Sequence, residues 1–185
     1  MRRRLVILML AVLSLSLAPV VALAQPSESG HGTKVERAVA VLQPIGDSGA
    51  SGVVHFTQEG DKVKVEGTIT GLKPGQHGFH VHEYGDLTDR KAGLSAGSHY
   101  NPTDMPHGHR TDENRHVGDF GNIEANPEGV ATFAFTDPVI ELNGPHAIIG
   151  RGLVIHAEAD KFTQPQGDAG DRVAMGVIGI AQPAP

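Results

Sequence analysis

The sequence contains no cysteine among its 185 residues. The chain can therefore form no disulfide, no thiolate metal site and no thiol nucleophile. Exported domains of this size often use disulfides, so their absence is unusual if this chain is exported.

Excess positive charge is also missing. The sequence has 15 Lys and Arg residues and 21 Asp and Glu residues, which gives a formal net charge of −6. Three of the arginines stand together at positions 2–4, so the rest of the chain is more acidic still. An acidic chain with no basic stripe is a poor nucleic-acid binder, and we expect no nucleic-acid partner.

The N-terminus has the pattern of a secretory signal peptide. The basic residues at 2–4 precede an apolar core, Leu5 to Val21, and the small-x-small sequence Ala22-Leu23-Ala24. We therefore expect residues 1–24 to be removed and the protein to be exported, to a periplasm or outside the cell, with no membrane segment afterwards. The alternative is an uncleaved membrane anchor, for which the apolar stretch is short.

After the signal peptide, residues 25–33 are small and polar and predict a flexible leader. Residues 34–185 suffice for one domain. Within DKVKVEGTITGL, Val63, Val65 and Ile69 share one face while polar residues share the other, which is typical of a half-buried strand. Further strands are predicted at Val35–Leu42, Gly52–Thr57, His77–His82, Val130–Phe135, Leu153–Ala157 and Val173–Ile180.

Short strands separated by turns predict an all-β antiparallel sandwich or barrel, and 24 glycines and 12 prolines suit many turns. Two segments, Gly85–Arg115 and Ala159–Asp171, lack strand or helix periodicity. Loops of that length in a compact domain are usually functional or disordered. The first contains three histidines, which favours function.

Histidines dominate the candidate site. His80 and His82 alternate on one predicted strand, so both leave the same face while Val81 points into the core. His99, His107, His116 and Asp119 together supply three imidazoles and one carboxylate, a full tetrahedral zinc set. A His-rich polar surface loop is the alternative, and a single strand histidine such as His156 is more often structural.

The chain resembles the copper–zinc superoxide dismutase family from about Lys34 to Gln182. The matching stretches are GFHVHEYGD, SAGSHYNP, HVGDFGN, IIGRGLVIH and GVIGIAQ. The resemblance implies copper on His80, His82, His99 and His156. It implies zinc on His99, His107, His116 and Asp119, with His99 bridging both ions. His109 competes with His107 and is interpreted as a surface residue; His31, His55, His77 and His146 are expected to have no metal role, with His55 and His77 facing solvent.

The same resemblance implies an eight-stranded antiparallel Greek-key barrel or sandwich with two long functional loops. It implies disproportionation of superoxide to dioxygen and hydrogen peroxide, as antioxidant defence outside the cytoplasm. Arg172 would receive the substrate anion, unless it pairs with Asp171 on the surface, and His99 would take up a proton. Asp160 would hydrogen-bond His80 and His107. Two alternatives remain: a copper- or zinc-sequestering protein without turnover, and a relative that has lost its copper site.

The chain departs from the family where a disulfide is usual, since Gly93 and Met175 stand near its two positions. We therefore expect stability to depend more on zinc binding. The second loop has one lysine, Lys161, so Arg90 and Lys91 are candidates for supplying positive potential. IIGRG and GVIGIAQ resemble segments near the interface of family dimers, which makes a homodimer possible.

Overall fold

The protein folds into eight β-strands. The computed structural model describes residues 34–183, so the expected signal peptide and leader lie outside the described residues. The strands are β1 (Arg37–Pro44), β2 (Ser51–Glu59), β3 (Lys62–Thr70), β4 (Gly75–His82), β5 (Asp119–Ala125), β6 (Ala131–Asp137), β7 (Gly152–His156) and β8 (Arg172–Ile180). One short 3₁₀ helix, η1 (Leu94–Ala96), accompanies them. Within residues 34–183, no helix has the length and apolar character needed to cross a membrane.

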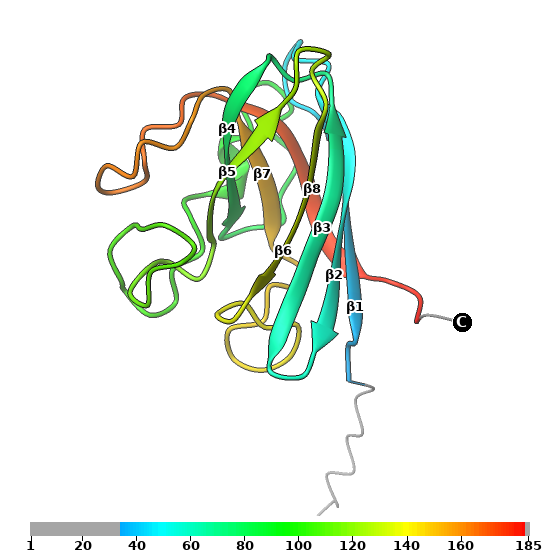
Figure 1. Ribbon diagram of the computed structural model, residues 1–185, viewed down its shortest axis with the longest axis vertical. Helices are drawn as coiled ribbons and strands as arrows, with labels where there is room; N and C mark the ends of the chain where they lie inside the picture. The colour runs from blue at the N-terminus through cyan, green and yellow to red at the C-terminus, as the bar shows by residue number, and fades with distance from the viewer. Residues whose placement is uncertain (1–33, 184–185) are drawn as a thin grey trace, which may run out of the picture. The chain divides into compact units, whose positions relative to one another are not determined.

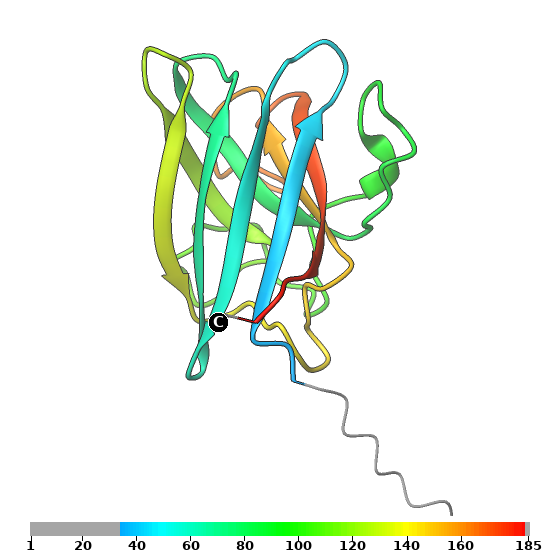
Figure 2. The ribbon, with the colours of Figure 1, turned by 90° about the vertical axis from the view of Figure 1, so that its right-hand side faces the viewer.

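All neighbouring strands pair antiparallel, in the order β5-β4-β7-β8-β1-β2-β3-β6. The sheet curls so that β5 and β6, the ends of this order, come close to each other and nearly close a barrel (Figures 1 and 2). Some neighbouring strands are consecutive in the sequence, such as β1 and β2, whereas others are far apart in it, such as β3 and β6. This mixture of hairpins and longer crossover connections is the Greek-key connectivity.

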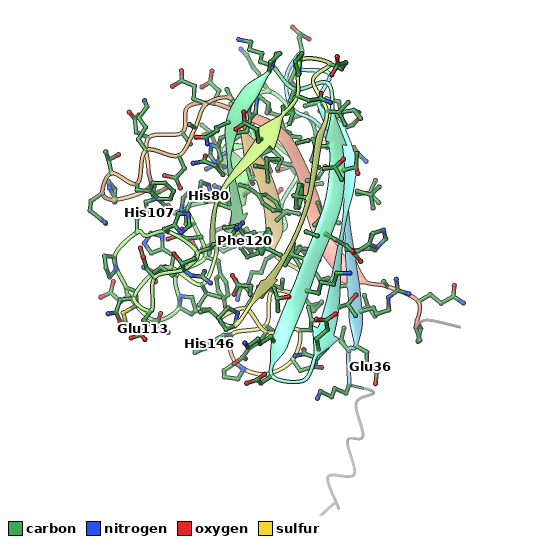
Figure 3. The ribbon with its side chains drawn as sticks, in the orientation of Figure 1. Glu36, His80, His107, Glu113, Phe120 and His146 are labelled. Atoms are coloured by element: carbon green, nitrogen blue, oxygen red, sulfur yellow. The ribbon has the colours of Figure 1, made fainter. Side chains whose placement is uncertain are left out.

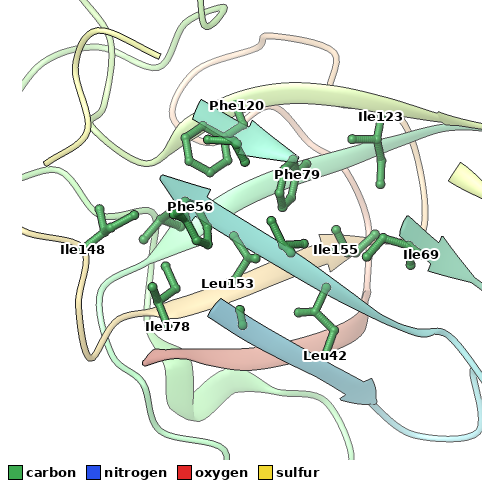
Figure 4. Packing of buried hydrophobic residues seen from close by; sticks show 14 of the residues in the cluster. Leu42, Phe56, Ile69, Phe79, Phe120, Ile123, Ile148, Leu153, Ile155 and Ile178 are labelled. Carbon is green, nitrogen blue, oxygen red and sulfur yellow. The ribbon is translucent and has the colours of Figure 1, made fainter. Parts of the chain in front are cut away.

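The core lies between the two halves of the barrel. Phe56, Phe79 and Phe120 meet there, surrounded by aliphatic side chains such as Leu153 and Ile155 (Figure 4). Alternation places these residues inside, because successive side chains of a strand point to opposite faces. Each fully buried side chain of this size contributes about 1.5–3 kcal/mol, and a one-residue slip of a strand would move its core side chains to the opposite face, so the core disfavours other registers.

Two features of the strands differ from the sequence analysis. Strand β5, Asp119–Ala125, was not located by alternation, because most of its residues are buried on both faces. His77 was expected to face solvent, and this is wrong, since its side chain is buried. His77 lies on the same face of β4 as Phe79 and Val81, which is the core face.

The two long aperiodic segments extend from one side of the barrel (Figure 1). In both, η1 is the only regular element. The second loop covers the outer face of β4, where the backbone N–H of Gly78 donates to the carbonyl of Glu158 at 2.8 Å. Consequently, side chains on the outer face of β4 are buried beneath loops.

Candidate metal centre

Strands β4 and β7 position three of the histidines on that covered outer face. His80 and His82 alternate along β4, and His156 ends the neighbouring strand β7. His99 joins them from the first loop through an isolated backbone bridge to His82. All four side chains are buried.

Two groups of potential ligands share His99. In each group the candidate ligand atoms lie within 4.8 Å of one another, and all the residues are buried. We call them the four-histidine group (His80, His82, His99, His156) and the aspartate group (His99, His107, His116, Asp119). Figure 3 shows His80 and His107 side by side where the loops meet the barrel.

Hydrogen bonds to backbone carbonyls fix which nitrogen each outer histidine presents. His82 Nδ1 donates to the carbonyl of Gly97 at 3.0 Å, and His156 Nδ1 donates to that of Gly170 at 3.0 Å. The two Nε2 atoms then face each other at 3.4 Å. Because the hydrogen of each ring is on Nδ1, both Nε2 atoms carry a free lone pair, and the two lone pairs are close enough to bind the same metal ion.

Asp160 links the two groups. Its carboxylate accepts from His80 Nε2 at 2.8 Å and from His107 Nε2 at 3.0 Å. The opposite nitrogen of His80, Nδ1, is buried without a hydrogen-bond partner. A buried polar atom without a partner is costly, and a metal ion would satisfy it. The opposite nitrogen of His107, Nδ1, is also buried and lies 2.9 Å from Asp119 Oδ2. Gly167 makes this packing possible, because a side chain there would collide with the Asp160 carboxylate.

Asp119 gathers the remaining ligands. Its Oδ1 lies 2.9 Å from His99 Nδ1 and 3.2 Å from His116 Nδ1, and its Oδ2 lies 2.9 Å from His107 Nδ1. Backbone N–H groups of Gly108 and His116 donate to Oδ2 and hold the carboxylate in place. Three imidazoles and one carboxylate thus converge as a tetrahedral zinc site requires.

Burial sets the charge state of the histidines. Removal from water lowers the pKa of His99 to about 4 and that of His156 to about 3, and holds that of His82 well below its usual value. Burial also opposes protonation of His107, but the adjacent carboxylates of Asp119 and Asp160 prevail and raise its pKa to about 9. Near pH 7 most of the four-histidine group is neutral, the form that binds metals.

A buried ion pair supports the turn that carries His116 and Asp119. Arg115 donates to Asp137 on β6 at 2.6 Å and to the backbone carbonyls of His116, Val117 and Asp119. The sequence analysis missed this role. No periodicity marks a buried arginine in a loop, and its acceptors are mostly backbone atoms.

Arg172 lies at the accessible side of the four-histidine group. A surface depression is lined by His99, His156 and Arg172, with Asp168 and Asp171 at its wall. The guanidinium is half-buried, and it donates to the carbonyls of Gly93 and Gly97. Both hydrogen bonds of the guanidinium go to backbone carbonyls, and neither goes to Asp171.

Comparison with known proteins agrees with this geometry. A family described as copper/zinc superoxide dismutase matches residues 50–178. The chain belongs to the copper/zinc superoxide dismutase family. A superoxide dismutase [Cu-Zn] 2 from Brassica juncea is 46% identical over 152 residues, which cover 78% of this chain and 97% of that protein. The crystal structure of the clock protein EA4 superposes with a TM-score of 0.74 at 46% identity, covering 80% of this chain and 97% of that one.

Membership in the dismutase family establishes the enzyme class, copper and zinc as its metals, and superoxide as its substrate. The donor sets fit these metals, since both groups offer only imidazole and carboxylate ligands. His109 and His146 belong to neither group of ligands.

Proposed function

We propose that the four-histidine group binds copper and the aspartate group binds zinc, with the His99 ring shared between them. The ring nitrogens support this division. His80 Nδ1, His82 Nε2 and His156 Nε2 are left for the first ion. His107 Nδ1 and His116 Nδ1 converge on Asp119 for the second. The observation that carries the proposal is that Asp160 occupies one nitrogen of both His80 and His107.

Copper supplies the one-electron chemistry by which one superoxide becomes dioxygen and a second becomes hydrogen peroxide. The residues bind and orient the anion. Arg172 presents a fixed guanidinium at the depression, the natural donor to a small oxyanion. His99 also lines the depression, and its Nε2 is the atom that we propose takes up a proton and passes it to the second anion, which takes its other proton from water. Zinc has no redox role, and its ligands keep His99 and the first loop ordered.

Metal analysis and a superoxide assay on the purified protein test these assignments. His80→Ala should abolish turnover while zinc stays bound, because His80 is a member of the four-histidine group and not of the aspartate group. His109→Ala is the matched control, an exposed histidine of the first loop, and should change neither activity nor metal content. Turnover that survives His80→Ala would refute the copper assignment. Both metals bound without turnover would indicate sequestration.

We further propose that the enzyme acts in antioxidant defence outside the cytoplasm. The support is the sequence of residues 1–24, with its basic start, apolar core and small-x-small end. Mass spectrometry of the protein from its native host should find Gln25 as the first residue. A chain that retains Met1 would contradict export by this route.

We also propose a homodimer formed through the outer faces of β1, β2 and β8. Val41 is 58% exposed and lies opposite Val53, and Val177 lies on the neighbouring strand β8. These adjacent exposed valines form an apolar patch, and its exposure to water is unfavourable in free energy. Sedimentation should give twice the chain mass, and Val41→Asp should give monomers. A monomeric wild type would refute this proposal and leave the catalytic one intact.

A further inference from the structure

The guanidinium of Arg172 is held by a single short turn. Its two nitrogens donate to the carbonyls of Gly93 and Gly97, which flank η1. The Gly97 carbonyl also accepts from His82 Nδ1 at 3.0 Å. The turn from Gly93 to Gly97, which we call the carbonyl turn, therefore sets the position of both the guanidinium and one histidine of the four-histidine group.

Backbone hydrogen bonds connect the carbonyl turn to its neighbours. The Gly93 N–H donates to the carbonyl of Asp89, and the Tyr84 N–H donates to that of Ala96. Both partners belong to the loop or to its start just after β4. These bonds shape the turn, but neither one joins it to β8, the strand that carries Arg172.

Met175 of β8 makes that connection. Its side chain is fully buried and packs with Ile45, Ala96 and Val154, so it contacts η1 itself. Gly93 lies directly above it. A methyl group on Gly93 would collide with Met175 Sδ and would come within 3.2 Å of Arg172 Cδ. Gly93 also has a φ of 72°, in the left-handed region that glycine adopts at low cost.

We propose that Met175 is a positioning residue for Arg172. Its thioether fills the space between Gly93 and β8 and so fixes the distance of the carbonyl turn from that strand. The Gly93 and Gly97 carbonyls then hold the guanidinium in a position from which it faces the depression. Methionine suits this position because its flexible, polarisable chain adapts to an irregular gap. The inference rests on the proposed function, in which Arg172 receives the substrate anion.

A double-mutant cycle on metal-loaded full-length protein tests the proposal. Met175→Ala should lower kcat/KM for superoxide about tenfold and weaken inhibition by inorganic phosphate by a similar factor, because a small displacement of a positioning group is costly. In an Arg172→Ala background the same change should have less than about a twofold effect, because residues that act through one another are not additive. Met175→Leu, which keeps the volume, should restore most of both values.

Ile178→Ala is the matched control. Ile178 is a fully buried residue of the same strand that packs in the main core, away from the turn. It should lower the unfolding temperature as much as Met175→Ala does and leave phosphate inhibition unchanged. If Met175→Ala does not fold, Met175→Val, which removes less of the side chain, tests the same contact and should also weaken phosphate inhibition.

Three results would overturn the inference. They are an unchanged phosphate inhibition in Met175→Ala or its substitute Met175→Val, a tenfold effect that persists without Arg172, and a loss of copper or zinc in place of weakened anion binding. Failure of the proposed function looks different. In that case Arg172→Ala alone would leave both turnover and phosphate inhibition unchanged.

Discussion

Arg115 and Asp137 form an ion pair at 2.6 Å in which both side chains are withdrawn from solvent. Removing one partner would leave the other charge buried and uncompensated. We expect Asp137→Asn to lower the free energy of unfolding by about 3–5 kcal/mol. Calorimetry of zinc-loaded protein checks this. Glu66→Gln, which breaks the exposed pair with Lys64, is the control and should leave the unfolding temperature unchanged. Equal effects of the two changes would contradict the account.

Asp160 accepts hydrogen bonds from rings in both ligand groups. In Asp160→Asn only one amide oxygen can accept, so one ring loses its orientation. We expect zinc affinity to fall about 10–100-fold, the usual effect of losing such a partner. Competition with a chelator measures the affinity. Asp168→Asn, an exposed acid of the same loop, should leave zinc affinity unchanged.

The metal-free protein should be most stable near neutral pH. The folded pKa values of His99, about 4, and His156, about 3, lie below the ordinary value of 6.5. Unfolding raises these values and takes up protons, so stability is lost as pH falls from 6.5 towards 3. The pKa of His107 is raised to about 9, so its contribution is present below 6.5 and lost as pH rises through 9. Thermal unfolding of chelator-treated protein measures this profile. Stability that increases steadily from pH 6.5 down to pH 4 would contradict it.

Positive charge near the depression is scarce. Lys161 lies 3.0 Å from Asp168 and 3.5 Å from Glu158, which offset its charge. If Arg90 and Lys91 attract superoxide, changing both to Gln should lower kcat/KM at low salt and flatten its dependence on ionic strength. Lys64→Gln on β3 is the control, because it removes one charge from a strand that does not line the depression. An unchanged salt dependence in the double variant would refute this role.

Alternation predicted strands wherever one face is buried and the other wet, as in β2 and β3. It failed at β5, because a strand buried on both faces loses its period. The residue pattern pointed to His80, His82 and the zinc set of His99, His107, His116 and Asp119, whereas His156 entered the prediction only through the family resemblance. The register of β4 could have placed His77 inside with Phe79, since residues two apart share a face.

The supports of the site were harder to predict. Arg115 and Arg172 are held mostly by backbone carbonyls, which every residue possesses, so the sequence carries no mark of which carbonyl is used. Gly97 is an example, because its oxygen serves both His82 and Arg172. Only the folded positions of the first loop and β8 bring these atoms together.

The contact between Gly93 and Met175 is a packing contact and contains no covalent bond. A barrel held in this way needs no thiol oxidation in order to mature, and a reductant finds no bond to break. We therefore expect the barrel to fold equally well with and without a thiol reductant.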